Sequence, residues 1–389
     1  MNELIHAFTD APVFTDSCFG FRKIIPEEIF GENGESIFEE TGALLQENGD
    51  ILFKIYAPDA HEVRVEVTID PETPDLYLKK DDKGFFTGIL PYSPRLAGPK
   101  TINYFIDGAF VLHPFTPIFY WHNRPANYVE IPDPDALFFA GEDVPRGAVT
   151  REYYYSNTMK RWESCLVYTP AGYNVNEKYP VLYLQHGHTE NEITWVYNGR
   201  VNNILDHMIA SGEAVPMIVV MNNGMERSAE DEAFSCGGVE SMIINDCRPF
   251  IEKKYSVYTD KWHRAMAGLS MGSAQTSYTT MTHPDLFGYA GLFSGFLMIR
   301  PTGGDVSRET EPHLQIMKTP EKFEEAFRVF YRSIGELDGL KGMYDGDEEF
   351  IKKCGIDQCR NYHAEVIPQR FHDWGCWRVA LRHFAGIIF

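Results

Sequence analysis

The clearest chemical signal in the sequence is a serine between two glycines. The segment Gly268-Leu269-Ser270-Met271-Gly272 follows an apolar run at residues 264–267 and precedes residues 274–281, which have the composition of a helix. This spacing is typical of a sharp turn from strand to helix, with the serine at the apex and glycines where a Cβ would collide with neighbouring backbone. We therefore predict Ser270 as a nucleophile. The Met271 N–H, at the start of the helix, is predicted to donate to a substrate oxyanion.

Such a serine needs a general base and an acid, which follow it in the order serine, acid, histidine on folds with this turn. His372 follows the last predicted strand and precedes a terminal helix, so we predict it as the base. His363, in the strand pattern, and His383, in the last helix, are interpreted as structural. Asp338 and Glu336 both follow the penultimate strand; we choose Asp338 to orient the imidazole and keep Glu336 as the alternative.

The segment Gln185-His186-Gly187-His188-Thr189 follows another predicted strand. A second oxyanion donor usually comes from a loop at this position, and we predict the His188 N–H. His186 and His188 could alternatively bind a metal ion. No acidic or cysteine cluster accompanies them at ligand spacing, so we expect no metal.

Large apolar side chains flank these motifs and are candidates for a substrate pocket: Trp195, Phe296, Met298 and Trp374. They could stack on an aromatic acyl group, although aromatic residues at such positions often only pack in the core. Residues 300–320 contain proline, glycine and charges without a clear period. This pattern predicts an insertion or a lid over the site.

The elements that must position these residues alternate between strand and helix after residue 150. We predict strands at residues 161–169, 180–185, 217–221, 264–267, 289–293, 327–332 and 362–368, and helices at residues 201–210 and 242–254. This alternation indicates a doubly wound, mainly parallel sheet with its site beyond the carboxyl ends of the strands. With the serine turn, it predicts an α/β-hydrolase fold.

The first part of the chain has a different period. Residues 51–57 and 63–69 alternate like half-buried strands, and Asp82-Lys83-Gly84 and Asp107-Gly108 supply hairpin turns. We predict an antiparallel, immunoglobulin-like β-sandwich. Prolines between residues 131 and 147 indicate a linker, so we divide the chain into domains 1–140 and 141–389.

Composition limits the possible partners. The chain has 389 residues and a formal net charge of −21, which argues against nucleic acid and anionic membrane, since both require a basic face. The amino terminus lacks a signal-peptide pattern and no stretch reaches membrane-spanning length, so we expect a cytoplasmic protein. Seven scattered cysteines, an odd number, favour free thiols. The aromatic-rich first domain leaves a homodimer as an expectation.

Residues from about 150 to 389 resemble the feruloyl esterases of carbohydrate esterase family 1, within the wider group of esterase D, antigen 85 and enterochelin esterases. The resemblance rests on Tyr168-Thr169-Pro170-Ala171-Gly172-Tyr173, Tyr179-Pro180-Val181-Leu182-Tyr183-Leu184-Gln185-His186-Gly187, Asn191-Glu192-Ile193-Thr194-Trp195, Ala267-Gly268-Leu269-Ser270-Met271-Gly272, Asp338-Gly339-Leu340, and His372-Asp373 with Trp377. It implies hydrolysis of a carboxylic ester through an acyl-enzyme, without a cofactor. The sequence departs from the family at two places where a pair of glycines or a Gly-Leu pair is usual, Gly272-Ser273 and His188-Thr189. We expect these departures to alter the acyl pocket more than the triad.

The first domain resembles the early-set immunoglobulin-like domain related to family 48 carbohydrate-binding modules. This resemblance rests on Phe53-Lys54-Ile55-Tyr56-Ala57-Pro58, Gly84-Phe85-Phe86-Thr87-Gly88 and Ile102-Asn103-Tyr104-Phe105-Ile106-Asp107-Gly108. Tyr120 and Trp121 could stack on sugar, but we favour packing against a neighbouring domain for them.

Three functions follow as hypotheses. The first is a serine carboxylesterase for feruloyl, other hydroxycinnamoyl or acetyl esters of plant-derived saccharides. The second is a siderophore esterase of the enterochelin type, for which the acidic chain is unfavourable because the catecholate ligand is anionic. The third is a catalytically inactive carbohydrate-binding protein.

Overall fold

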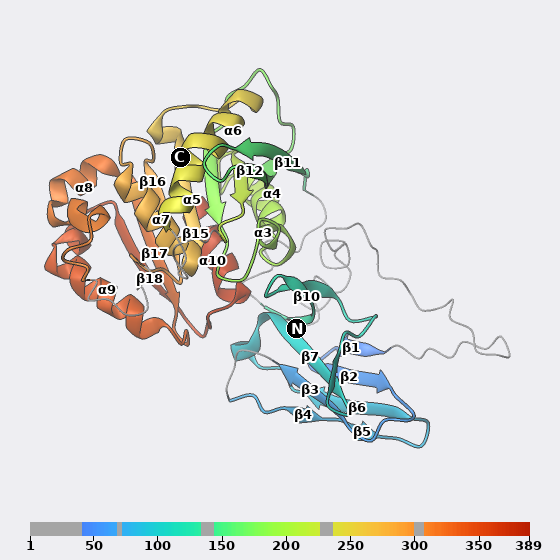
Figure 1. The fold of residues 1–389 in the computed structure, drawn as a ribbon. Helices are drawn as coiled ribbons and strands as arrows, with labels where there is room; N and C mark the ends of the chain where they lie inside the picture. The colour runs from blue at the N-terminus through green and yellow to red at the C-terminus, as the bar shows by residue number, and fades with distance from the viewer. Residues whose placement is uncertain (1–40, 68–71, 134–143, 226–235, 299–306) are drawn as a thin grey trace. The chain divides into compact units, whose positions relative to one another are not determined.

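The computed structural model describes residues 41–67, 72–133, 144–225, 236–298 and 307–389. The chain divides into two compact units, Met1–Asp143 and Val144–Phe389 (Figure 1). This division lies next to the proline-rich stretch in which we predict the domain boundary at residue 140, a position outside the described residues. Each unit has a hydrophobic core of its own.

Two antiparallel sheets form the first unit. One has the order β1-β2-β6-β5; the other has the order β4-β3-β7-β10-β9, with β8 added to β7. The strands are β1 (Gly42–Leu45), β2 (Ile51–Tyr56), β3 (Val63–Val67), β4 (Leu76–Tyr77), β5 (Lys79–Lys80), β6 (Phe85–Leu90), β7 (Gly98–Ile106), β8 (Ala109–Val111), β9 (Ile118–Trp121) and β10 (Arg124–Ile131). Buried and exposed residues alternate along β2 and β3, and side chains of both sheets share one core that includes Phe53 and Tyr104. The predicted turns at residues 82–84 and 107–108 join β5 to β6 and β7 to β8.

An eight-stranded sheet forms the centre of the second unit, in the order β11-β12-β14-β13-β15-β16-β17-β18. Strands β11 and β12 are antiparallel to their neighbours, and the six strands from β14 to β18 are parallel. Their bounds are β11 (Ala148–Ser156), β12 (Arg161–Thr169), β13 (Val181–Gln185), β14 (Ile218–Asn222), β15 (Arg264–Leu269), β16 (Tyr289–Phe293), β17 (Val329–Gly335) and β18 (Tyr362–Ile367). The doubly wound, mainly parallel sheet predicted from the alternation of elements is therefore present.

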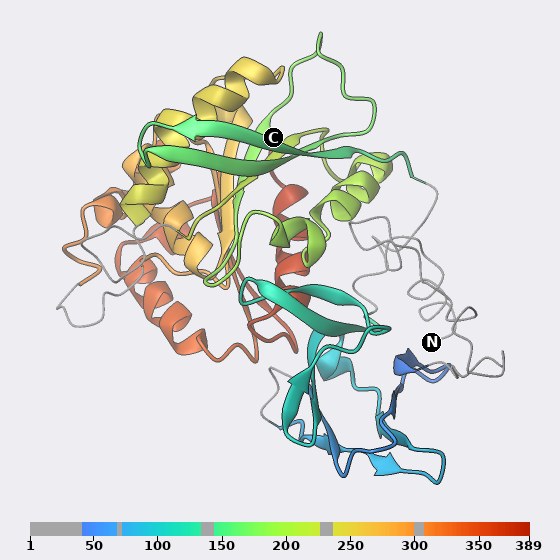
Figure 2. The ribbon, with the colours of Figure 1, turned by 45° about the vertical axis from the view of Figure 1, so that its right-hand side comes forward.

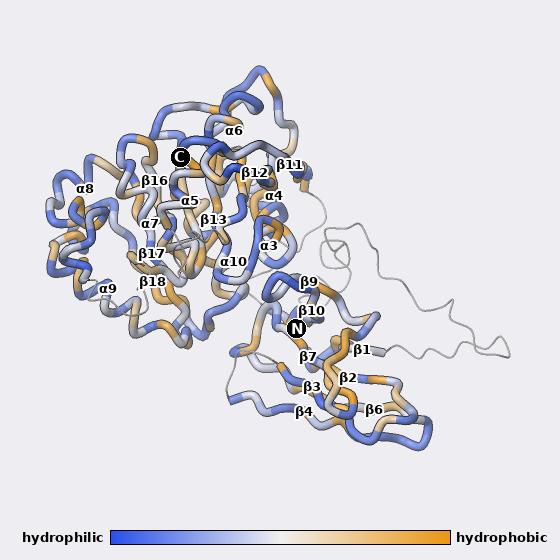
Figure 3. Tube along the Cα trace, viewed as in Figure 1, coloured by the Kyte–Doolittle hydropathy of each residue, from blue (hydrophilic) through white to orange (hydrophobic). Residues whose placement is uncertain are grey.

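Helices cover both faces of this sheet (Figure 2). They are α3 (Thr194–Tyr197), α4 (Val201–Ser211), α5 (Cys236–Met242), α6 (Arg248–Lys254), α7 (Met271–Thr282), α8 (Pro320–Ala326), α9 (Lys341–Lys353) and α10 (Trp374–Ala385). A π-helical turn, Ile243–Cys247, joins α5 to α6. The strands between the helices are buried on both sides and rich in hydrophobic residues, which are orange in Figure 3. In β16, for example, Leu292 belongs to the core that includes Phe323 of α8, whereas Phe293 packs against Phe384 of α10.

The structure adds two elements that the sequence analysis did not predict. Strand β11 follows the predicted linker directly; only its Glu152, Tyr154 and Ser156 are buried, and most of the strand is exposed at the sheet edge. Within the predicted insertion or lid, residues 307–320 contain a short 3₁₀ helix, His313–Lys318, whose Leu314 and Met317 are fully buried. Residues 300–306 lie outside the described residues.

Two further properties concern the described residues only. None of the helices in that part of the chain is long and apolar enough to cross a membrane. Six of the seven cysteines lie there, and all six are free.

Candidate active site

The serine turn lies between β15 and α7. Ser270 has φ +50° and ψ −116°, a conformation that costs backbone energy and is maintained by the surrounding structure. Its N–H donates to Phe293 O of the neighbouring strand at 2.9 Å. A Cβ on Gly268 would lie 2.4 Å from the carbonyl oxygen of Gly272, and one on Gly272 would lie 2.5 Å from that of His186. Only glycine fits at both positions, as the spacing of the motif indicates.

The structure brings Ser270, His372 and Asp338 together in one line of hydrogen bonds. His372 Nε2 lies 3.0 Å from Ser270 Oγ, and His372 Nδ1 lies 2.7 Å from Asp338 Oδ2. Asp338 follows the carboxyl end of β17, and His372 lies between β18 and α10. Because a carboxylate can only accept, Nδ1 carries the proton and Nε2 is left to accept the serine proton.

Asp338 is buried and accepts hydrogen bonds on both oxygens. Oδ2 also accepts Ser294 Oγ at 2.8 Å, and Oδ1 accepts Leu340 N at 2.8 Å. Burial acts to raise the pKa of Asp338, but the hydrogen bond and charge of His372, aided by Leu340 and Ser294, outweigh it and hold that pKa below its usual value. The side chain therefore remains ionised at neutral pH, as an orienting acid must.

Ser294 is a functional residue that the sequence analysis missed. Its hydroxyl donates to Asp338 and accepts the indole N–H of Trp377 at 2.9 Å. The ring of Trp377 also meets that of His372 edge to face, with centroids 5.2 Å apart. A signal was available, because Ser294 directly follows the apolar strand β16, at the sheet edge where catalytic residues gather.

The alternative acid and the other histidines lie elsewhere. Glu336 is exposed, and its carboxylate accepts Gln369 N at 2.9 Å. His363 is exposed on β18, and His383 pairs with Glu365 at 2.9 Å. None of these side chains has a hydrogen bond to the Ser270–His372 pair within the described residues.

The candidate oxyanion donors are the backbone groups of Met271, the first residue of α7, and of His188, which is exposed in the loop after β13. In that loop the N–H of Gly187 is already bonded, since it donates to Glu190 Oε2 at 2.9 Å. Thr189, with φ +67°, donates its N–H to Met225 Sδ at 3.3 Å.

His186 is not arranged as a metal ligand. Its Nε2 accepts Gly224 N at 2.8 Å, and its Nδ1 lies 2.8 Å from Gly187 O, so both ring nitrogens are bonded. Burial lowers the pKa of this imidazole, which keeps it neutral. No group of three or more potential metal ligands occurs among the described residues.

The four pocket candidates fall into two pairs. Trp195 and Trp374 are almost fully buried and meet edge to face with centroids 5.2 Å apart, and the Trp195 indole donates to Gln185 O at 2.8 Å. They support the site from inside the core. Phe296 and Met298 lie in the loop after β16, where Phe296 N donates to Ser273 Oγ at 2.8 Å. Ser273 Oγ in turn donates to Ser270 O at 2.5 Å, which ties this loop to the nucleophile.

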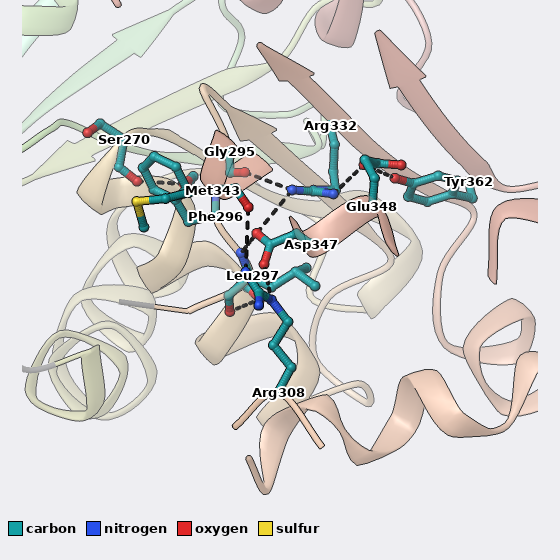
Figure 4. Close-up of polar contacts among 12 residues, drawn as sticks. Ser270, Gly295, Phe296, Leu297, Arg308, Arg332, Met343, Asp347, Glu348 and Tyr362 are labelled. Carbon is teal, nitrogen blue, oxygen red and sulfur yellow. Dashed lines mark hydrogen bonds and ion pairs between the residues drawn. The ribbon is translucent and has the colours of Figure 1, made fainter. Parts of the chain in front are cut away.

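A buried group of charges holds the same loop from the other side (Figure 4). Arg332 of β17 donates to Gly295 O at 2.8 Å and pairs with Asp347 of α9 at 3.2 Å. Asp347 accepts Leu297 N at 2.9 Å and pairs with Arg308 at 2.5 Å. The loop beside the nucleophile is therefore fixed by side chains from two elements, β17 and α9, that lie far from it in the sequence.

Comparison with known proteins shows which family and fold this chain is similar to. Residues 156–322 match the model of the Esterase family, described as "Putative esterase". An endo-1,4-beta-xylanase/feruloyl esterase of Xylanibacter ruminicola is 34% identical over 375 residues, which cover 94% of this chain and 48% of that protein. The chain thus spans about half the length of this curated relative.

Solved structures show the same fold. A CE1 ferulic acid esterase from Anaeromyces mucronatus, solved in complex with ferulic acid, matches with a TM-score of 0.54 and 21% identity, covering 64% of this chain and 93% of that one. The enterobactin esterase of Shigella flexneri, solved in the presence of enterobactin, matches with a TM-score of 0.63 and 13% identity, covering 92% of this chain and 98% of that one. At these identities the similarity establishes an α/β-hydrolase type of fold.

Proposed function

We propose that this chain, residues 156–322 of which match the model of the Esterase family, is a serine carboxylic ester hydrolase that cleaves feruloyl and related hydroxycinnamoyl or acetyl esters of plant-derived saccharides. The observation that carries the proposal is the set of hydrogen bonds from Ser270 through His372 to Asp338. Three residues of the right types, at the ends of different strands, meet at distances suited to proton transfer.

In the acylation step, Ser270 Oγ attacks the carbonyl carbon of the ester while its proton passes to His372 Nε2. The carbonyl π electrons move to the oxygen, and the N–H groups of Met271 and His188 are the proposed donors to that oxyanion. When the tetrahedral intermediate collapses, the C–O bond to the alcohol breaks and the proton on Nε2 goes to the departing oxygen. Asp338, ionised throughout, stabilises the imidazolium that forms in between.

Deacylation repeats these steps with water. His372 Nε2 takes a proton from the water molecule, whose oxygen attacks the acyl carbon, and Ser270 leaves with the proton returned by Nε2. The products are the free carboxylic acid and the regenerated serine. No metal or cofactor enters either step.

Two considerations support the choice of substrate. The relative from Xylanibacter ruminicola that matches 94% of this chain is named as both a xylanase and a feruloyl esterase. In this chain Phe296 and Met298 are buried in the loop tied to the nucleophile, so we propose that an aromatic acyl group would pack near this loop rather than on exposed apolar surface. We further propose that the first unit is an early-set, immunoglobulin-like domain, in keeping with its two antiparallel sheets around one core.

Hydrolysis of a siderophore trilactone is the second candidate function. It is favoured by one observation, the match of the enterobactin esterase structure over 92% of this chain, which includes both units. The net charge of −21 is unfavourable for an anionic catecholate substrate.

A panel of esters tests these candidates. Methyl ferulate, 4-nitrophenyl acetate and enterobactin are incubated with the wild type and with Ser270→Ala, and release of acid or phenol is measured. We expect the wild type to prefer methyl ferulate and the variant to lose at least about 10⁴-fold in kcat. Preference for the trilactone would transfer the substrate assignment to the second candidate.

The inactive binding protein is tested separately with an aryl phosphonate ester that labels activated serines. Covalent labelling of the wild type but not of Ser270→Ala is expected. Failure of the wild type both to react with the phosphonate and to cleave any ester of the panel would refute the proposed function.

A further inference from the structure

Glu190 is a buried carboxylic acid beside the proposed oxyanion loop, and the steps described above do not use it. Its side chain accepts Gly187 N at 2.9 Å, and its own N–H donates to Gly187 O at 3.3 Å. The turn at residues 187–190 is thus closed twice by the same residue. Thr189, within the turn, has φ +67°, so the closure also maintains a conformation that non-glycine residues seldom adopt.

The carboxyl group lies close to the nucleophile. A Cβ placed on Gly187 would be 3.4 Å from Glu190 Oε2, 3.6 Å from Ser270 Cβ and 2.5 Å from Leu269 Cδ1. The carboxyl group and the serine therefore lie on the same small region around Gly187, together with the side chain of Leu269. A carboxyl placed so near the reacting centre acts on it electrostatically.

A second glutamate on the same loop shows what is unusual about Glu190. Glu192 is also buried, but it accepts Ser164 Oγ at 2.6 Å and pairs with Arg151 at 3.3 Å. Among the described residues no arginine or lysine pairs with Glu190. Burial raises the pKa of Glu190 to about 8, and the hydrogen bond from Gly187 only partly opposes this effect.

We propose that Glu190 is a positioning residue for ester hydrolysis: its uncharged carboxyl group holds the turn at residues 187–190 beside the nucleophile without opposing the negative charge that develops on the substrate oxygen. The inference rests on the proposed function of the site. In the ionised form the same carboxylate still accepts the Gly187 N–H, but its charge, at most about 7 Å from Ser270 Cβ, slows acylation by at least about tenfold at an effective dielectric constant near 20.

Other titratable groups on the surrounding elements do not account for such an effect above neutral pH. The loop itself contributes His186 and His188, and Glu192 follows it. The indole of Trp374 lies near Glu190, and the titratable residues just before Trp374 are His372 and Asp373. His186 is held neutral by burial, His372 is paired with Asp338, and Asp373 caps α10 by accepting Cys376 N. His188 is exposed, and Glu192 is ion-paired.

The test is the pH dependence of kcat/KM from pH 6 to 10, measured with methyl 3,4-dimethoxycinnamate, an ester without a phenol that ionises in this range. For the wild type we expect a step near pH 8 to a plateau at least about tenfold lower. Glu190→Gln keeps an oxygen that can accept Gly187 N–H but cannot ionise, so it should retain the upper value through the step. Glu192→Gln is the matched control and should keep the wild-type step.

A second measurement does not depend on catalysis. A carboxyl whose pKa is raised on folding contributes stability that is fully present below its unfolded pKa and is lost as pH rises through its folded pKa. Thermal unfolding of the wild type should therefore lose stability between pH 6 and pH 9 relative to Glu190→Gln.

The outcomes are separable. An unchanged step in Glu190→Gln, or its loss in Glu192→Gln, overturns the assignment to Glu190. Equal pH dependence of unfolding in the wild type and Glu190→Gln also overturns it, since Glu190 would then be charged in the folded state. If the wild type cleaves no ester, the proposed function fails, and the unfolding comparison still decides whether Glu190 is uncharged.

Discussion

Replacement of Asp338 by asparagine should nearly abolish ester hydrolysis while leaving the fold intact. Leu340 N donates to Oδ1 of the side chain, so the oxygen of asparagine is expected to remain there and its NH₂ group to take the place of Oδ2. That NH₂ group can only donate to His372 Nδ1, which forces the other tautomer of the imidazole. His372 Nε2 then carries a proton towards Ser270 and cannot accept the serine proton.

The magnitude follows from the distance between the charges. A carboxylate 2.7 Å from the imidazolium is worth about 6 kcal/mol at an effective dielectric constant of about 20. Loss of this interaction in the transition state lowers kcat by roughly 10⁴-fold, the same order as this substitution costs in a serine protease triad. Ser294 loses its acceptor at the same time, but its hydroxyl can still accept from Trp377.

The assay compares kcat for methyl ferulate among the wild type, Asp338→Asn and Glu336→Gln, with circular dichroism as a check on folding. Glu336 lies two residues away and is exposed, so its substitution should leave kcat within about twofold of the wild type. The reasoning is refuted if Asp338→Asn keeps more than a tenth of the wild-type kcat. A loss of activity in Glu336→Gln equal to that in Asp338→Asn would make Glu336 the orienting acid.

Two further substitutions test the surroundings of the triad. Asp347→Ala leaves the buried Arg332 without one of its carboxylates and should lower the free energy of unfolding, measured by denaturant titration, by about 3 kcal/mol or more. Asp345→Ala, at an exposed position on the same helix, is the control and should change that free energy by less than about 0.5 kcal/mol. Gly272→Ala places a methyl group 2.5 Å from His186 O and should cost about 3 kcal/mol and most of the activity. Gly342→Ala, in α9 with open space around it, is the control and should instead stabilise the protein slightly in the same denaturant titrations.

The local parts of the site were predictable because each depends on a short segment. The turn at Ser270 needs glycines at fixed spacing, and the positions of Asp338 and His372 follow from the order of strands along the chain. Strands β13, β14 and β16 have bounds within one residue of those predicted, since continuous apolar runs of this length fit strands buried on both faces.

The parts that the sequence did not reveal depend on contacts between distant segments. Strand β11 has one mostly exposed face and an edge position, so its hydrophobic pattern is weak. Helix α9 has two glycines and four acidic residues, a composition that does not indicate a helix by itself. Ser294 and Asp347 acquire their importance only because β16, β17 and α9 come together in the folded chain.

The loop after β16 links the triad to the segment that carries Phe296 and Met298. Ser294 at its start supports Asp338, and Phe296 two residues later lies beside the nucleophile through Ser273. The backbone on both sides of Phe296 is also hydrogen-bonded: Gly295 N donates to Ser333 O, Gly295 O accepts from Arg332, and Leu297 N donates to Asp347. A change of this backbone would therefore move Ser294 and weaken the triad, whereas a change of the Phe296 side chain would not.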